Sequence, residues 1–257
     1  MSDYSNILQD LKALNLEKAF PVFIPSQNRE VQFTPLTVKQ QKDIIKGALD
    51  AATSNVLFNS VTNDIIKSNS SEPIDYLILD KTSILVHFRL QALGDQIKLP
   101  DPDDDNVEYD VNLRDHANTF PTMTLAPEVL QETIVYSNIT GALRTPPLSI
   151  DTKFNDDTKK SLEQVQSGDL SDTIGDLFIF ELIKFLHTLT IGEKTVVVSD
   201  LSIPQAVSLV ENLPLMLSNK IITFIERVRE FEQGFSNVKT ADKSLELPID
   251  ATFFNTT

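Results

Sequence analysis

The sequence predicts an α+β fold with an N-terminal β-hairpin plus helices, a small β-rich middle section and a helical C-terminal part. Three observations support this prediction. Residues 22–34 alternate around a polar turn, as hairpins do. Apolar residues recur at helical spacing in two long regions, residues 38–94 and 177–233. Short alternating segments lie between these regions and favour strands.

We expect four parts along the chain. Residues 1–95 form the hairpin and its helices, and residues 96–172 the β-rich middle section. Residues 173–236 form a helical part that can share one core with the first, and residues 237–257 form a tail. At 257 residues, the chain is long enough for one large domain or two small ones.

Composition excludes several classes of function. Hydrophobic residues make up 41% of the chain, enough to build a core, while the net charge is −15 with Lys and Arg scattered along the chain. Such a charge disfavours binding to nucleic acid or to anionic membranes. Cysteine is absent, and no membrane-length apolar run, signal peptide or glycine-rich nucleotide motif occurs. We therefore expect no cofactor, small-molecule ligand, nucleic acid or membrane partner.

The first hundred residues predict a helix, a hairpin and more helices, in that order. Residues 6–19 form an amphipathic helix with Ile7, Leu8, Leu11 and Leu14 on its apolar side. The hairpin follows, with strands 22–24 and 29–34 around the turn 25–28. Thr37 is placed to cap a helix over 38–52, followed by a helix over 55–67. The inward positions of the helix over 38–52 are Val38, Ile44, Ile45, Ala48 and Leu49.

Residues 74–94 predict the centre of the core, because they carry two apolar stripes and a surface helix needs only one. Asp80 interrupts the run and can cap a second helix that begins there. Gly94 ends the pattern, as a C-terminal glycine does. Arg89 lies between the stripes, where an unpaired charge is costly, so we expect it to pair with a carboxylate or with backbone carbonyls. Asp95 or an acid from another element is the favoured carboxylate. Replacing Arg89 with Leu should then weaken folding.

The middle section predicts four strands, over residues 96–99, 107–113, 122–125 and 132–137, with a loop over 100–106. Residues 141–172 carry a weak signal and predict an irregular crossing with one short helix near 159–165. Beyond it we expect a buried helix over 177–189, a strand over 195–198, and helices over 202–212 and 215–233.

Candidate sites for chemistry are few. Asp101, Asp103 and Asp105 have the first three spacings of an EF-hand, but Asn106 and Asn112 occupy the positions that need Gly and Glu, which favours a solvated loop. His87, His116 and His187 have no metal-ligand spacing and fit core or rim positions better.

No serine stands in a nucleophile motif either. Two carboxylate pairs, Glu128 with Glu132 and Asp156 with Asp157, keep a hydrolase as a rival function, although nothing singles out one pair. We expect that no residue is catalytic.

Three segments together carry a family resemblance: residues 24–50, which contain F-x-P-L-T-V-K, residues 79–95 and residues 180–228. The arrangement resembles the baseplate proteins of T-even-type contractile-tailed phages, namely the hub subunit and the related hub-assembly factor. Ala92 stands where the family has a serine, and the acidic loop is expanded. These departures leave open which of the two roles this chain has.

The resemblance implies a structural role in the tail baseplate of the virion, after synthesis in host cytoplasm. The implied partners are other baseplate and hub proteins. A chaperone that helps the hub form and then leaves the particle is the alternative within this class. The rival of another class is the carboxylate-based hydrolase, acting on cell wall.

We expect partner contacts from two segments. The first is the hairpin and the segment after it; the second is the tail, whose alternating residues suit addition to a sheet edge and whose adjacent phenylalanines suit a pocket on a neighbour. A frayed terminus explains the tail equally well. If it docks, deleting residues 245–257 should leave the melting temperature nearly unchanged. The contact residues are Val31, Phe33, Pro35, Leu36, Leu245, Leu247, Ile249, Phe253 and Phe254, with Arg89 and Gly94 as structural residues.

Overall fold

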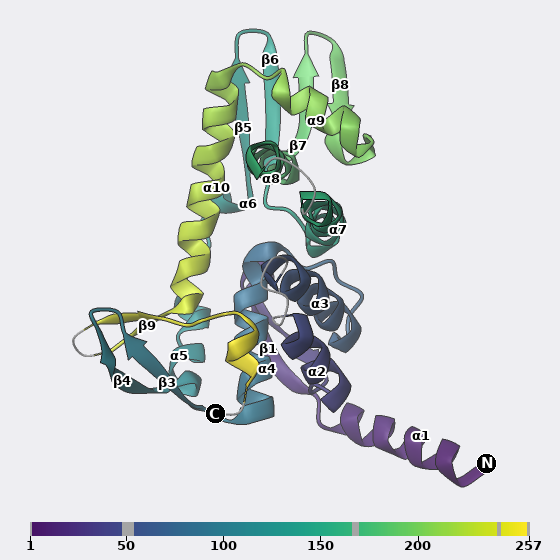
Figure 1. Ribbon diagram of the computed structural model, residues 1–257, viewed down its shortest axis with the longest axis vertical. Helices are drawn as coiled ribbons and strands as arrows, with labels where there is room; N and C mark the ends of the chain where they lie inside the picture. Colours follow the sequence, from purple (N-terminus) through teal and green to yellow (C-terminus); the bar gives the residue numbers. More distant parts are fainter. Residues whose placement is uncertain (1, 48–53, 166–169, 241–242, 256–257) are drawn as a thin grey trace.

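The computed structural model describes residues 2–47, 54–165, 170–240 and 243–255, which form two lobes joined by a long helix (Figure 1). Within these residues the buried apolar side chains form two clusters. We call the part around the first cluster the hairpin lobe and the part around the second the sheet lobe. Small antiparallel sheets and helices build both, so the predicted α+β class is confirmed.

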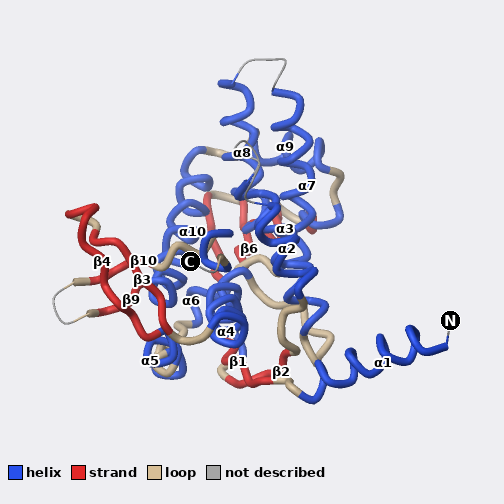
Figure 2. The backbone as a smooth tube through the Cα atoms, turned by 60° about the horizontal axis from the view of Figure 1, so that its bottom comes forward, coloured by secondary structure: helices blue, strands red, loops and turns tan. Residues whose placement is uncertain are grey.

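The predicted N-terminal hairpin is confirmed. β1 (Phe20–Ile24) pairs antiparallel with β2 (Arg29–Phe33) across a 3-10 turn, η1 (Pro25–Gln27). Asn28 closes the turn at φ +49°, a conformation that Asn tolerates well. The hairpin buries Val22, Ile24 and Phe33 against the rest of the lobe. The preceding helix, α1 (Ser2–Glu17), projects from the body (Figure 2).

Two helices follow, α2 (Val38–Gly47) and α3 (Ser54–Asn69). The predicted cap is present: the Gln40 amide N–H donates to Thr37 Oγ1 at 3.2 Å, and the Thr37 amide N–H donates to Gln40 Oε1 at 2.9 Å. Ile44 is buried as predicted, but the inward placement of Val38 is wrong, because its side chain is 85% exposed. Residues 48–53, including Ala48 and Leu49, lie outside the described residues.

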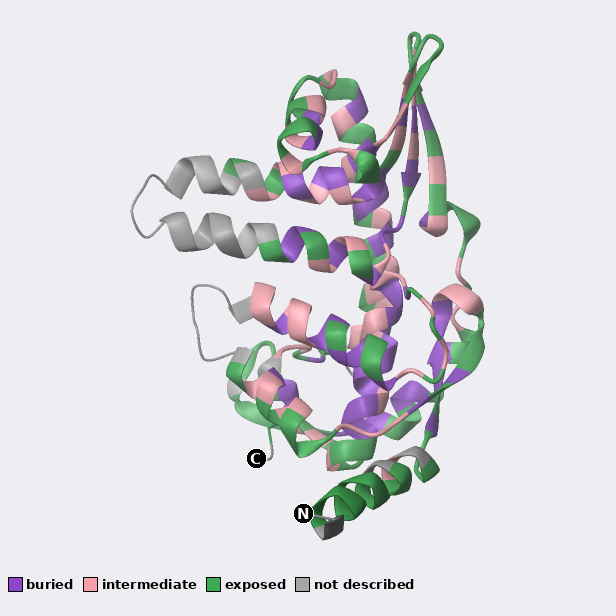
Figure 3. Ribbon diagram, turned by 90° about the vertical axis from the view of Figure 1, so that its right-hand side faces the viewer, coloured by how far each residue is buried: buried purple, intermediate pink, exposed green. Residues whose placement is uncertain are grey.

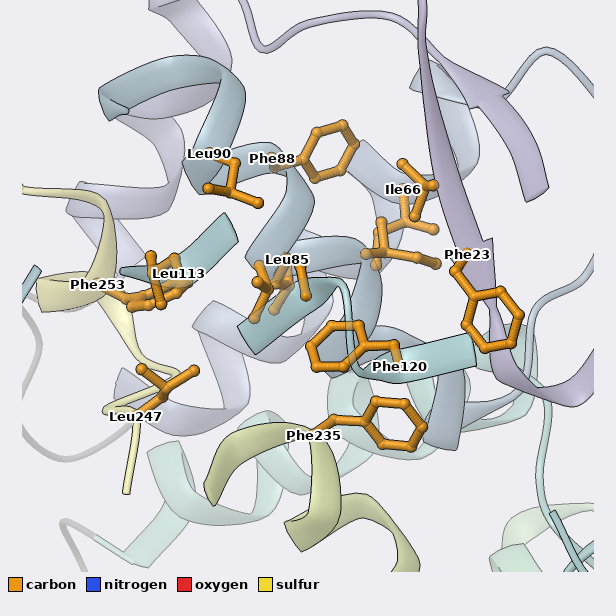
Figure 4. Packing of buried hydrophobic residues seen from close by; sticks show 14 of the residues in the cluster. Phe23, Ile66, Leu85, Phe88, Leu90, Leu113, Phe120, Phe235, Leu247 and Phe253 are labelled. Carbon is orange, nitrogen blue, oxygen red and sulfur yellow. The ribbon is translucent and has the colours of Figure 1, made fainter. Parts of the chain in front are cut away.

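The centre of the hairpin lobe is α4 (Lys81–Leu93), preceded by η2 (Ile78–Asp80). The prediction of burial on two sides is confirmed for α4, where the side chains of Ile84 to Val86 and of Phe88 are fully buried (Figure 4). Asp80 does not cap α4 with its side chain. Its carboxylate instead accepts from the Ser26 amide at 2.8 Å and the Leu77 amide at 2.9 Å, tying the hairpin turn to η2.

The segment after α4 turns into a second hairpin. β3 (Gln96–Asp101) pairs with β4 (Asp104–Asn112), so the loop predicted over 100–106 is wrong: most of it belongs to the two strands. The strand predicted over 122–125 is also wrong. That region instead contains α5 (Leu113–Ala117), η3 (Phe120–Thr122) and α6 (Pro127–Leu130).

The sheet lobe is built on a four-stranded antiparallel sheet in the order β5-β6-β7-β8. β5 (Gln131–Tyr136) and β8 (Lys194–Val197) match predicted strands. β6 (Ile139–Arg144) and α7 (Leu148–Val165) replace the irregular crossing predicted over 141–172, which is therefore wrong. α8 (Leu170–Phe185) ends earlier than predicted, because β7 (Leu186–Ile191) takes the rest of that apolar run.

The division expected at residue 172 falls inside α8, and the sheet takes strands from both sides of it. After η4 (Val198–Asp200), α9 (Ile203–Glu211) packs Ala206 and Val210 into the core of the sheet lobe. α10 (Leu215–Ser236) then runs from the sheet lobe to the hairpin lobe (Figure 1). Its buried side chains in the sheet lobe are Leu217, Ile221, Phe224, Ile225 and Val228. Phe235 is buried in the hairpin lobe.

The C-terminal tail folds back onto the hairpin lobe. It contains β9 (Asn237–Lys239), β10 (Ser244–Glu246) and η5 (Ala251–Phe254). Leu245, Leu247, Phe253 and Phe254 are at most 2% exposed, and the Phe254 carbonyl accepts from Gln41 Nε2 at 3.1 Å. In this structure the tail is therefore neither free to dock on a neighbour nor frayed. The tail is part of this chain's own core.

Candidate functional site

A large cleft, about 950 Å³ in volume, lies beside the C-terminal end of α10. One wall comes from the end of β4, α5 and η3, and the other from the last turns of α10 and from β9. Asn112 fixes the first wall, because its Oδ1 accepts from the amides of Arg114 at 2.9 Å and Asp115 at 3.3 Å and so begins α5. The two walls come from sequence segments more than 100 residues apart.

A buried histidine ties the two walls together. His116 Nε2 lies 2.8 Å from the Phe235 carbonyl oxygen, so the ring carries its proton there and donates it. His116, Phe120 and Phe235 stack edge to face, with centroids 5.0 Å apart for both Phe120 pairs. Burial lowers the pKa of His116, which favours the neutral ring. This aromatic group fixes the base of the cleft.

The cleft joins apolar and acidic groups. Met123, Phe231 and Val238 give it apolar surface, while Asp110, Asp115 and Glu230 supply negative charge at exposed positions, against Lys239 as the basic group. Apolar surface with one sign of charge at the edge is typical of a protein-binding surface. It suits a segment of another protein that carries apolar and basic side chains.

A charged network fills the junction of the two lobes. Asp151 on α7 accepts from Asn63 of α3 at 3.0 Å and from Lys184 of α8 at 3.1 Å. Lys184 also pairs with Glu181 at 2.7 Å. Lys184, Lys81 and Asn63 hold the pKa of the Asp151 carboxyl below its usual range, although burial opposes them. The network therefore connects helices from both lobes.

Two titratable groups beside this network have pKa values close to neutral pH. Burial lowers the pKa of Lys81 to about 8, and its ammonium group donates to the carbonyl and side-chain oxygens of Asn59, at 3.2 and 2.9 Å. Burial, and then repulsion from Glu181, raises the pKa of Glu232 to about 7. Neither group lines the large cleft.

The structure places the predicted contact residues mostly inside the hairpin lobe. Val31 and Phe33 of the hairpin are at most 1% exposed. In the tail, Leu245, Leu247, Phe253 and Phe254 are at most 2% exposed. In this conformation these six side chains are buried within the chain's own core, and their role as partner contacts stays a prediction. Pro35, Leu36 and Ile249 are half-buried. Leu36 and Ile249 pack against the same core.

The predicted structural residues behave differently from each other. Gly94 ends α4 at φ +87°, where a side chain would strain the backbone. Arg89 is 7% exposed and its guanidinium lies over the Phe253 ring at 5.4 Å. The pairing predicted with Asp95 is wrong, since Asp95 faces Arg114 at 3.7 Å. Among the described residues no acceptor bonds Arg89 Nε or Nη1.

The EF-hand-like acids pair with a lysine. Lys243 Nζ lies 2.6 Å from Asp101 Oδ1 and 2.9 Å from Asp103 Oδ2, and Tyr109 also donates to Asp101. The hydrogen bond from Lys243 lowers the pKa of Asp101. Across the described part of the chain, no three His, Cys, Asp or Glu side chains gather in a way that could hold a metal ion. No described helix is both long and apolar enough to cross a membrane.

Sequence reasoning missed the cleft, because no local pattern marks it and its walls meet only in the fold. The sequence singled out His116 only as a core or rim histidine, and Asn112 only as a departure from the EF-hand pattern. The amphipathic helix predicted over residues 6–19 is present as α1, and the structure leaves its apolar side exposed.

The comparisons with known proteins give one match. Residues 18–254 match the family model described as T4 bacteriophage base plate protein, which covers nearly all of the described chain. No curated protein and no solved structure matches the chain.

Proposed function

This chain belongs to the T4 bacteriophage base plate protein family, and from that premise we propose that it is a component of the hub of a contractile-tail baseplate. It acts by binding other baseplate proteins and not by catalysis. The family membership supports a phage baseplate role, and the resemblance of three segments to hub proteins supports the finer assignment. An assembly factor that leaves the particle is the alternative.

The cleft beside α10 is the main structural support for a function in protein binding. Its two walls are fixed by the His116–Phe235 hydrogen bond, so it needs no rearrangement to receive a partner. Its acidic edge selects a basic segment and speeds encounter, and its apolar surface supplies affinity. We therefore place a baseplate partner's basic, apolar segment in this cleft.

A cell-wall hydrolase is less well supported. Such an enzyme needs a carboxylic acid with a raised pKa in a cleft that admits substrate. The two described carboxyl groups with clearly raised pKa values are Asp80, at about 6, and Glu232, at about 7. Neither lines the large cleft, and Asp80 is fully buried. Glu132 of the predicted pairs instead binds Arg227 at 2.8 Å.

The test is complementation of a phage that lacks this gene, followed by mass spectrometry of purified particles. A hub subunit is present at a defined copy number; a chaperone supports infection but is absent from particles. The cleft variant Asp115→Lys with Glu230→Lys reverses the charge of its edge. The control, Asp200→Lys with Glu211→Lys, makes the same change at exposed positions outside the cleft.

We expect the cleft variant to fold normally but to fail in particle assembly, while the control assembles as the wild type does. Equal assembly of the two variants rules out the cleft as the binding surface. Degradation of peptidoglycan by the purified chain, lost when one carboxylate becomes its amide, would establish the hydrolase instead.

A further inference from the structure

The first helix, α1, exposes an apolar stripe that nothing in this chain covers among the described residues. Tyr4, Ile7, Leu8, Leu11 and Leu14 are each between 41 and 71% exposed. Figure 3 shows the helix exposed along most of its length. The described contact that fixes its last turn is a hydrogen bond from Asn15 Nδ2 to the Pro35 carbonyl at 3.4 Å. Side chains of this size normally pack against another element.

The spacing of the stripe indicates a helical partner. Tyr4, Ile7, Leu11 and Leu14 follow one another at intervals of three, four and three residues, the spacing of the contact seam in a coiled coil. Leu8 widens the seam on one side. A free helix of this length is marginal in water, so a second helix packed on the seam would stabilise it.

The charges beside the seam indicate what the partner carries. Asp10 and Glu17 lie one heptad apart along the same edge of the stripe, and Asp3 has the same spacing in the sequence. In a two-helix coil these positions face the flanking residues of the partner helix. An antiparallel pair of α1 helices would oppose acids to acids, and two copies of a chain of net charge −15 repel each other.

We propose that α1 docks on a helix of another baseplate protein that presents an apolar seam flanked by Lys or Arg. This inference rests on the proposed function for the identity of the partner, but not for its chemistry. The family match begins at residue 18, directly after α1, so the helix adds a second docking surface to the part of the chain that the family shares. It is separate from the cleft beside α10.

The test uses two synthetic three-heptad helices with Leu along the seam, one with Lys and one with Glu at the flanking positions. Binding to the full chain is measured by fluorescence anisotropy, at two salt concentrations. Three chains are compared: the wild type, the seam variant Ile7→Ser/Leu11→Ser/Leu14→Ser, and the edge variant Asp10→Lys/Glu17→Lys. Since the seam is exposed, the melting temperature of the body should be the same in all three.

We expect the wild type to prefer the Lys helix by about tenfold, as two added charge pairs predict, with less preference in high salt. The edge variant should prefer the Glu helix, and the seam variant should bind neither. Binding by the seam variant, or an unchanged preference in the edge variant, contradicts the proposal. So does a wild-type dimer in sedimentation, or binding to anionic vesicles, that the seam variant abolishes.

Phage complementation separates this inference from the proposed function. If the wild-type chain is missing from particles and is not needed for their assembly, the proposed function fails, whatever the peptides show. If the wild type supports assembly and the seam variant does so equally well, only the docking of α1 is contradicted.

Discussion

Glu232 lies near the end of α10, where charged groups from several helices meet. Glu181 of α8 and Asp151 of α7 raise its pKa, while Lys81 of α4 and Arg229 of α10 lower it; burial outweighs them all and leaves the pKa at about 7. In the unfolded chain the group titrates near its ordinary value of 4.5. The native state therefore holds this proton more tightly, and its stabilising effect is complete below about pH 4.5 and is lost as pH rises through about 7.

We predict that Glu232→Gln removes this loss of stability at high pH. At about pH 8 the variant should be more stable than the wild type by up to roughly 3 kcal/mol, while at about pH 5 the difference should shrink toward zero. Urea unfolding across this range measures it, with the exposed Glu226→Gln as control. Asp80 also titrates with a raised pKa but is unchanged in both chains, so it cancels in the difference. A variant less stable at pH 8 would mean that the carboxylate is held by Lys81.

Arg89 gives a second prediction at this scale. Burial lowers its pKa, and two of its nitrogens lack a hydrogen-bond acceptor among the described residues. A buried charge without an acceptor costs stability, whereas its stem and its contact with Phe253 contribute to packing. This reverses the expectation that an apolar replacement weakens folding.

Arg89→Met keeps the stem and removes the charge, so the free energy of unfolding should be unchanged or higher. Arg89→Ala also removes the packing and should cost about 1 to 2 kcal/mol relative to Met. Thermal and urea unfolding of both variants measures the difference. A Met variant less stable than wild type by more than about 1 kcal/mol would show that the guanidinium has an acceptor after all.

Among the elements, the tail changes its role most between sequence and structure. η5 inserts Phe253 and Phe254 beside α2 and α4, with the two rings 5.4 Å apart. Truncating a buried phenylalanine leaves a cavity and costs about 3 to 5 kcal/mol. Phe253→Ala should therefore lower the melting temperature strongly, and deletion of residues 245–257 should lower it further.

The matched control is Phe178→Ala, because that ring is 50% exposed. Differential scanning calorimetry of the two variants gives the comparison directly. If Phe253→Ala melts like Phe178→Ala, the tail is not part of the core in solution, and docking on a partner becomes the better description again.

The elements also show what the sequence could predict. The hairpin, α4, α9 and α10 have clear local signals: a polar turn between alternating residues, or apolar residues at helical spacing. The signal of α7 is weak, because its described buried residues mix Asp151 and Asn155 with the apolar Leu148 and Phe154. Asp151 accepts from Asn155, Asn63 and Lys184. The end of α8 is hidden because the apolar run continues into β7 without a turn residue.

At the scale of the whole molecule, the candidate site could not be predicted for the same reason. The cleft joins residues 110–124 to residues 230–240 and Ser244, and the path of α10 brings these segments together. The tail residues complete a core whose other buried members lie mostly between residues 20 and 120, with Leu148 and Phe235 further along the chain. In both cases the determining contacts are far apart in sequence.

The return of the tail to the hairpin lobe sets an order of folding during synthesis. Among the described residues, the sheet lobe draws its four strands and, apart from Leu79 of η2, its buried core side chains from between Val129 and Val228. The hairpin lobe begins at Phe20 but lacks Phe235, Leu247 and Phe254 until the ribosome has passed the whole sheet lobe. The part made first is therefore the part completed last, and its apolar surface stays open to chaperones, or to a hub partner, throughout translation.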